Sequence, residues 1–213
     1  MIHIAIADDH MVVRQGLKQI LSEDAGFRLV GEAANGHETL TLVRERELDV
    51  LVLDLTMPGR SGIELIAMIK AEKPKLPVLV LSMHTEEQYA VRAIKAGAAG
   101  YLTKESISAE LIHAVNKVAG GGRHITATVA ERLALEVGEP TTLAPHRLLS
   151  DREYQIFEMI VAGRSLSNIA TTLCINTKTV STYKARILQK MQMPTAAALI
   201  HYAIENGLDA SSQ

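Results

Sequence analysis

Apolar residues in the first 120 positions come in short runs separated by longer amphipathic segments. The apolar runs lie at 2–7, 29–33, 50–53, 78–81 and 100–102. Apolar residues recur with helical periodicity in the segments between these runs, at 10–22, 36–46, 61–72, 86–96 and 106–119. Because apolar runs without polar alternation are typical of strands buried on both faces, we expect a parallel sheet. Strands separated by helices predict a five-stranded α/β sandwich of flavodoxin-like type, with helices on both faces.

The pattern changes beyond the three consecutive glycines at 120–122, which end the last helix of this unit. Residues 126–137 can form one more helix, and the stretch from Gly138 to Pro145 then indicates an irregular connection. From Leu149 onward every pattern is helical. We therefore predict a first domain at 1–120, a linker at 121–147 and an all-α domain of four helices at 148–208.

Capping residues mark the helices of the second domain. Ser150 and Glu153 form a capping box, in which the serine hydroxyl accepts from the Glu153 amide and the glutamate reaches back to the Ser150 amide. The remaining caps and stops are supplied by Gly163, Ser165, Asn176 and Gly207. This spacing predicts short helices joined by tight turns.

Composition excludes several classes of protein. Hydrophobic residues make up 47% and charged residues 22% of the chain, as in ordinary globular proteins. No apolar run reaches the roughly 20 residues of a membrane-spanning helix, and the start of the chain is too short and acidic for a secretory signal. A single cysteine, Cys174, excludes an internal disulfide and favours a reducing cytoplasm. We expect Cys174 to be a small buried hydrophobe in a turn, and the eight histidines show no ligand spacing.

Charge is distributed unevenly along the chain. Residues 1–119 carry 13 Lys/Arg against 16 Asp/Glu, whereas 164–194 contain five basic residues and no acidic one. A basic stretch of this kind suits a duplex nucleic acid, while the acidic first half suits a different ligand.

Polar side chains stand where the predicted strands end. Asp8 and Asp9 follow the first strand. The third strand ends at Asp54, the fourth ends at Ser82, and Lys104 follows the fifth. Ligands of open α/β sheets bind beyond the carboxyl ends of the strands, so these groups should converge at one edge. Alone, the two adjacent aspartates could be a solvated strand end that caps the following helix.

Three converging carboxylates need a cation, and oxygen ligands favour Mg²⁺. Asp54 could then act as a nucleophile that accepts a phosphoryl group as an acyl phosphate. Lys104 and Mg²⁺ would neutralise the charge on that group, and the Ser82 hydroxyl could hydrogen-bond it.

Four motifs make the first 119 residues similar to a response-regulator receiver domain. They are Ala-Asp-Asp-His at 7–10, Leu-Asp-Leu-Thr-Met-Pro-Gly at 53–59, Leu-Ser at 81–82 and Ala-Ala-Gly-Tyr-Leu-Thr-Lys at 98–104. The resemblance implies that Asp54 is the phosphoacceptor. It also implies that Asp9, Asp54 and the backbone carbonyl of Thr56 bind Mg²⁺ directly, and Asp8 binds it through water.

The same resemblance assigns a switch to the receiver. Ser82 and Tyr101 form the switch pair, and Lys104 contacts the phosphate. Movement of Ser82 toward the phosphate vacates space for the Tyr101 ring, which would remodel the surface around residues 83–102. Without the resemblance, Tyr101 would be interpreted as a packed strand aromatic.

Helices at 169–173 and 177–191, with a three-residue turn between them, have helix-turn-helix spacing. On the second helix, helical periodicity places Val180, Ile187 and Met191 in the core stripe. The opposite face carries Lys178, Ser181, Thr182, Ala185 and Gln189, which could enter a major groove. Basic residues that could contact phosphates are Arg164, Lys178, Lys184, Arg186 and Lys190.

Residues 149–193 resemble the LuxR-type helix-turn-helix, so the whole chain is similar to a NarL/FixJ-type two-component response regulator. Tyr183 stands where histidine is common, and Ser181 and Ala185 occupy recognition positions where some members carry lysine. The resemblance implies a transcription regulator rather than an enzyme, with a histidine kinase, double-stranded DNA and RNA polymerase as partners. It also implies a homodimer formed on phosphorylation or on DNA, with the last helix, around 195–206, as its seam.

Two other functions stay open at this point. A Mg²⁺-dependent phosphotransferase could use an aspartyl intermediate on a similar sheet, although no insertion for a substrate cap interrupts the first 119 residues. Alternatively, the helix-turn-helix could bind a protein, and its basic residues could be a solvated helix face.

Overall fold

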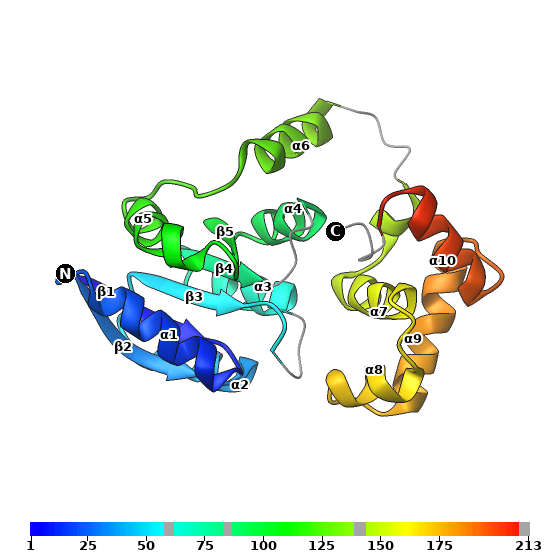
Figure 1. Ribbon diagram of the computed structural model, residues 1–213, viewed down its shortest axis with the longest axis horizontal. Coiled ribbons are helices and arrows are strands. Elements are labelled where there is room, and N and C mark those ends of the chain that lie inside the picture. Colours follow the sequence, from blue (N-terminus) through cyan, green and yellow to red (C-terminus); the bar gives the residue numbers. More distant parts are fainter. Residues whose placement is uncertain (58–61, 83–86, 139–143, 209–213) are drawn as a thin grey trace. The chain divides into compact units, whose positions relative to one another are not determined.

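The computed structural model describes residues 1–57, 62–82, 87–138 and 144–208 (Figure 1). The chain divides into two units, Met1–Glu139 and Pro140–Gln213. The first therefore extends beyond the predicted boundary at residue 120. Its sequence motif at 53–59 and its switch surface at 83–102 both run partly outside the described residues, at 58–61 and 83–86.

The first unit is built on one parallel sheet, as predicted. Its strands, in sheet order, are β2 (Phe27–Ala33), β1 (Ile2–Ala7), β3 (Val50–Asp54), β4 (Val78–Ser82) and β5 (Gly100–Thr103). The predicted adjacency of the first and third strands is confirmed, because Ala7 of β1 pairs with Leu53 of β3. Apolar side chains of β3 and β4, and those of β1 from Ile4 onward, are buried, which explains their runs without polar alternation.

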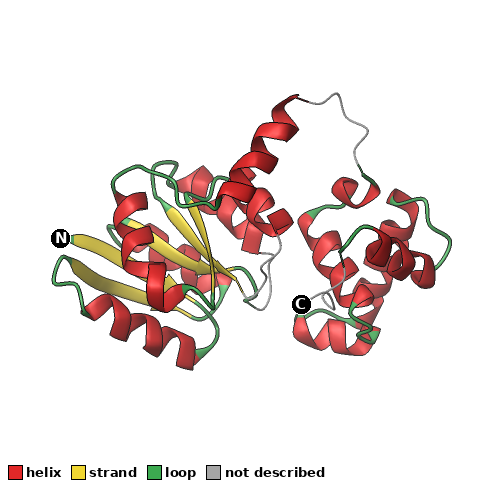
Figure 2. Cartoon of the chain, turned by 45° about the horizontal axis from the view of Figure 1, so that its top comes forward, coloured by secondary structure: helices red, strands yellow, loops and turns green. Residues whose placement is uncertain are grey.

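Helices cover both faces of this sheet (Figure 2). They are α1 (Met11–Ser22), α2 (Gly36–Glu45), α3 (Gly62–Glu72), α4 (Glu87–Lys95) and α5 (Ile107–Ala119). Contacts join α1 to α5, whereas α2 packs on α3 and α3 on α4. On the α1 and α5 side, Leu17, Leu111 and Val115 pack into one buried cluster with residues of the sheet. This apolar packing holds the strand ends, and the polar groups on them, in fixed register.

The segment after α5, predicted to lie in a linker at 121–147, pairs with the sheet. His124 extends the sheet beside β5, where its amide donates to the Ala99 carbonyl (3.0 Å) and its carbonyl accepts from the Tyr101 amide (2.9 Å). The helix expected at 126–137 is present as α6 (Ala127–Gly138) and contacts α4, with Val129 buried. Backbone pairing at an exposed strand edge carries no side-chain pattern, so the sequence did not predict it.

The second unit is all-α, as predicted. A short 3₁₀ turn, η1 (Pro145–Leu148), precedes α7 (Asp151–Val161), α8 (Leu166–Thr172), α9 (Thr177–Lys190) and α10 (Ala196–Glu205). The predicted caps are confirmed: both halves of the Ser150–Glu153 capping box form, and Ser165 and Asn176 accept from backbone amides of the next helices. No helix among the described residues is long and apolar enough to cross a membrane.

Candidate functional site

The polar groups predicted to converge do meet at the carboxyl edge of the sheet. Asp8 directly follows β1, Asp54 is the last residue of β3 and Ser82 the last of β4, and all three are fully buried. Lys104 follows β5, and its backbone amide donates to the Ser82 carbonyl at 2.7 Å. The parallel register therefore delivers two carboxylates, a hydroxyl and an ammonium to one place.

Lys104 joins the two buried carboxylates. Its Nζ lies 2.7 Å from Asp8 Oδ2 and 2.9 Å from Asp54 Oδ2. Burial disfavours the charged ammonium, but these hydrogen bonds outweigh that effect and raise the pKa of Lys104 above its ordinary value. Lys104 therefore stays protonated and balances part of the negative charge in the pocket.

Thr56 fixes the Asp54 carboxylate from the other side. The Thr56 hydroxyl lies 2.9 Å from both Asp54 oxygens, and its amide donates to Oδ1 at 3.1 Å. The sequence predicted only a role for the Thr56 carbonyl. Side chains two residues apart around a strand end commonly make such turn contacts, which is the signal that could have identified the hydroxyl.

The loop between β1 and α1 is held by bonds that the sequence did not reveal. Asp8 Oδ1 accepts from the His10 amide at 2.7 Å, but His10 is the N-cap residue of α1 and Asp8 is fully buried, so Asp8 is neither a helix cap nor a solvated strand end. Arg14 donates to the Asp8 carbonyl at 2.6 Å and forms an ion pair with Glu32 of β2. Lys18 reaches the same glutamate. Arg14 thereby ties the acidic loop to the neighbouring strand.

The pocket has the donor set of a cation site. Asp8, Asp9, His10 and Asp54 each offer a ligand atom, and these four atoms lie within 4.8 Å of one another. Asp9 Oδ1 is buried yet accepts no hydrogen bond from the described residues. A carboxylate oxygen in that state, beside two further carboxylates, fits a hard divalent cation such as Mg²⁺.

Tyr101 lies on β5 and is buried, at 8% exposure. Its backbone amide donates to the His124 carbonyl. Lys104 follows the same strand.

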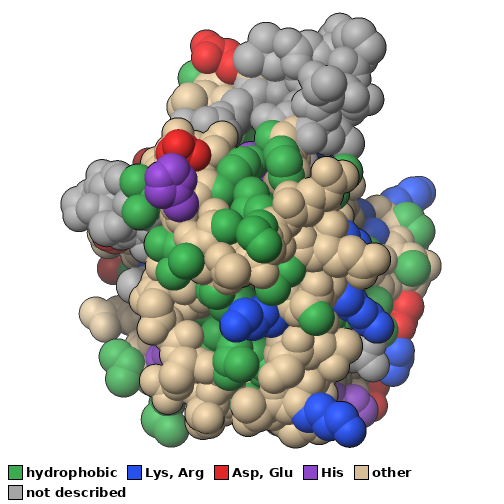
Figure 3. All heavy atoms as spheres, turned by 90° about the vertical axis from the view of Figure 1, so that its right-hand side faces the viewer, with side chains coloured by type: hydrophobic (Ala, Val, Ile, Leu, Met, Phe, Trp, Pro, Cys, Tyr) green, Lys and Arg blue, Asp and Glu red, His purple; other side chains and the backbone are tan. Residues whose placement is uncertain are grey.

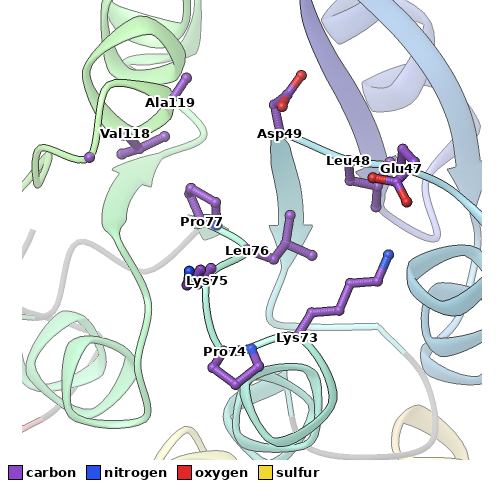
Figure 4. A pocket seen from close by; sticks show the side chains of 11 residues that line it. Glu47, Leu48, Asp49, Lys73, Pro74, Lys75, Leu76, Pro77, Val118 and Ala119 are labelled. Atoms are coloured by element: carbon purple, nitrogen blue, oxygen red, sulfur yellow. The ribbon is translucent and has the colours of Figure 1, made fainter.

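A separate hollow lies at the opposite edge of the sheet (Figure 4). Its volume is about 630 Å³, and residues preceding β3 and β4 and ending α5 line it. Two of its charged groups are bonded within the protein: Lys73 donates to the Arg46 carbonyl, and Asp49 accepts from the His3 amide. This hollow therefore lacks the converging groups that distinguish the acid pocket.

The helix-turn-helix forms as predicted from α8 and α9. Val180, Ile187 and Met191 are buried in the core of the unit. The residues predicted to face a duplex are all exposed: Lys178, Ser181, Thr182, Ala185 and Gln189. On the face shown in Figure 3, basic side chains lie among uncharged polar and apolar ones.

Comparison with known proteins identifies both units. Residues 4–116 match the model of the response regulator receiver domain, and residues 147–203 match that of the bacterial regulatory proteins of the luxR family. The chain is a NarL/FixJ-type response regulator. This family consists of transcription regulators with a receiver and a LuxR-type DNA-binding domain, not of enzymes.

The relatives of this response regulator match over its whole length. It is 36% identical to the response regulator GacA of Pseudomonas viridiflava, with 100% of both chains covered. It is 35% identical to the response regulator UvrY of Escherichia coli, with 98% of this chain and 96% of UvrY covered. A solved complex of the response regulator RcsB with DNA is 25% identical, with a TM-score of 0.59 and coverage of 95% and 98%.

Two predictions for the DNA-binding unit of the response regulator are changed by its structure. Cys174 is exposed rather than buried, because the turn between α8 and α9 places it at φ 51° on the surface. Lys190, predicted to contact phosphate, forms an ion pair with Glu153 of the capping box, at 2.6 Å. Arg164 and Arg186 remain exposed, and Lys184 is partly buried.

The Lys190–Glu153 pair links α9 to the start of α7. Burial raises the pKa of Glu153, but the hydrogen bonds from Lys190 and from the Ser150 amide and hydroxyl outweigh it and hold that pKa below its usual range. A carboxyl whose pKa is lowered by folding stabilises the fold above its unfolded pKa of about 4.3 and loses this effect as pH falls through the folded pKa.

Substitution of Lys190 should therefore destabilise the second unit in a pH-dependent way. We expect Lys190→Met to reduce the free energy of unfolding by about 1–2 kcal/mol at pH 7, because it removes a charged donor from a buried carboxylate. The loss should shrink as pH falls below the unfolded pKa of about 4.3 and through the lowered pKa of the folded carboxyl. Urea unfolding followed by circular dichroism measures both values.

The exposed Lys178→Met is the matched control and should change stability by less than about 0.5 kcal/mol. An equal loss in both variants, or one from Lys190→Met that is independent of pH, would show that the ion pair does not stabilise the unit.

Proposed function

We propose that the acid pocket accepts a phosphoryl group on Asp54 and that this modification controls DNA binding by the helix-turn-helix. The observation that carries the proposal is Lys104, whose ammonium joins the buried carboxylates of Asp8 and Asp54 beside an unbonded oxygen of Asp9. Such a pocket supplies a nucleophile and a fixed positive charge together.

In the proposed reaction, a carboxylate oxygen of Asp54 attacks the phosphorus of a phosphohistidine on a partner kinase. A P–O bond forms, the P–N bond breaks, and the electron pair leaves with the imidazole, giving an acyl phosphate on Asp54. Bound Mg²⁺, held by Asp9, Asp54 and the Thr56 carbonyl, with Asp8 acting through water, would neutralise the phosphoryl oxygens. Thr56 keeps the carboxylate oriented, and Lys104 is positioned to transfer its hydrogen bonds to the phosphate.

The phosphate would then act on the switch pair. Its oxygens are strong acceptors for the Ser82 hydroxyl, which ends β4. Because Tyr101 is packed on the neighbouring strand β5, movement of Ser82 would change the space available to its ring. The state selected in this way would bias the surface that includes α4.

The output is sequence-specific binding to double-stranded DNA in the cytoplasm, followed by regulation of RNA polymerase. The exposed face of α9 would enter the major groove, with Lys178 and Arg186 near phosphates. Structures of two RcsB dimers on DNA support a dimeric complex. Ile204 of α10 is 59% exposed, which suits this helix as the dimer seam.

The phosphoacceptor assignment is tested by labelling with a small phosphodonor and Mg²⁺. We expect Asp54→Asn to abolish incorporation, because the amide cannot form the acyl phosphate. The matched control, Asp49→Asn, removes a carboxylate at the opposite edge of the sheet and should retain labelling. Retained labelling in Asp54→Asn would place the phosphoacceptor elsewhere.

The DNA-binding assignment is tested by the salt dependence of duplex binding. Affinity should fall steeply with salt, and Lys178→Ala should lower the slope of log K against log salt by about 1, because one phosphate contact is lost. Lys117→Ala, an exposed lysine on α5, serves as the control with an unchanged slope. A flat salt response would favour a protein partner for the helix-turn-helix instead.

A further inference from the structure

Arg14 extends from α1 to the loop that carries the acidic residues. Strand pairing ends at this loop: the Asp8 amide still donates to the Ala33 carbonyl of β2 at 3.1 Å, but β1 itself ends at Ala7. The next main-chain group is the Asp8 carbonyl, which accepts from Arg14 Nη1 at 2.6 Å. Arg14 therefore continues, with a side chain, the support that the neighbouring strand gives to β1.

This bond acts on the peptide that joins Asp8 to Asp9. Since a peptide unit is planar, holding its carbonyl also fixes its amide and the point from which Asp9 starts. The carboxylates of Asp8 and Asp54 are buried and have further anchors in Lys104 and Thr56. The side chain of Asp9 is 27% exposed, so its orientation depends more on the main chain of the loop.

Arg14 is itself held in place from β2. Its Nε lies 3.4 Å from Glu32 Oε2, and Nζ of Lys18, one turn farther along α1, lies 2.9 Å from Oε1 of the same glutamate. The Arg14 side chain is only 16% exposed, which limits the conformations open to its guanidinium. A strand residue thus orients the group that binds the loop.

Arg14 and Lys18 differ in their contact with the loop. Both carry one positive charge and both pair with Glu32, but the bond to the Asp8 carbonyl comes from Arg14. If only their charge mattered, removal of either side chain would strengthen the binding of a divalent cation, because like charges repel. If Arg14 holds the loop, its removal must weaken that binding. The two roles therefore predict effects of opposite sign.

The position of the loop matters because of the ion that the pocket fits. Asp9 offers one of the ligand atoms that lie within 4.8 Å of one another, and Mg²⁺ demands near-ideal octahedral geometry. Building on the proposed phosphoacceptor site, we propose that Arg14 is a positioning residue. Through the Asp8 carbonyl it holds the carboxylate of Asp9 ready for a cation bound beside Asp54. Arg14 acts through the main chain and is not itself a ligand.

The test measures Mg²⁺ binding to the full-length chain by isothermal titration calorimetry. Arg14→Met keeps an apolar stem and removes the guanidinium. We expect the Mg²⁺ Kd to rise by ~10-fold, as for loss of other groups that orient metal ligands. In labelling of Asp54 by a small phosphodonor, the Mg²⁺ concentration at half-maximal rate should rise by the same factor. The maximal rate should change by less than about 3-fold, because the lost interaction acts on cation binding.

Lys18→Met is the matched control. It removes the same charge and a partner of the same glutamate, but leaves the bond to the Asp8 carbonyl. Its Mg²⁺ Kd should stay at the wild-type value or fall. Arg14→Lys keeps the charge but lacks the planar fork that reaches Glu32 and the carbonyl together, so it should also raise the Kd. This second variant decides the question if Arg14→Met does not fold.

The outcomes separate this inference from the proposed function. An unchanged or lower Kd in Arg14→Met, or an equal rise in Lys18→Met, would overturn the positioning role even if the wild type is labelled on Asp54. Absence of labelling in a wild type that binds Mg²⁺ would overturn the proposed function, and the Kd values would still decide the role of Arg14. A wild type that binds no Mg²⁺ would overturn both.

Discussion

The contact of Lys104 with Asp8 and Asp54 is the interaction on which the rest of the first unit depends. Two fully buried carboxylates would repel each other, and a buried charge without a partner costs several kcal/mol. The ammonium offsets this cost and is itself kept charged by the two acids. Such a balance is stable but replaceable, because a divalent cation and a phosphate can take over the same charges.

This balance requires the sheet to hold its strand ends in register. β1 and β3 are direct neighbours, and Asp8 and Asp54 leave the sheet at the same edge. β5 lies one strand farther along, beyond β4, so Lys104 reaches the acids from a loop anchored on the Ser82 carbonyl. Lys104 therefore connects the two acids to β4 and β5, the strands that carry Ser82 and Tyr101.

Much of this arrangement could be predicted from the sequence. Apolar runs defined the strands because each central strand is buried on both faces, and the strand ends then located Asp8, Asp54, Ser82 and Lys104. Helix caps such as Ser150 and Asn176 were equally readable, since capping depends on residues close in sequence.

Contacts between distant or backbone groups could not be predicted in this way. The Arg14 bond to the Asp8 carbonyl involves a backbone acceptor, which has no sequence signature. The pairing of His124 with β5 likewise uses only main-chain groups. The apolar character of Cys174 predicts a buried side chain. Its positive φ in the turn between α8 and α9 places it on the surface instead. The ion pair of Lys190 could not be predicted, because its partner Glu153 lies 37 positions away in the sequence.

The central proposal is that phosphorylation of Asp54 decides whether the helix-turn-helix occupies its DNA targets. Genome-wide capture of bound DNA from cells that express the wild-type chain or Asp54→Asn tests it most directly. Under conditions that activate the kinase, we expect sites occupied by the wild type to lose most of their occupancy in Asp54→Asn at equal protein level. Equal occupancy of the same sites by both chains would contradict it.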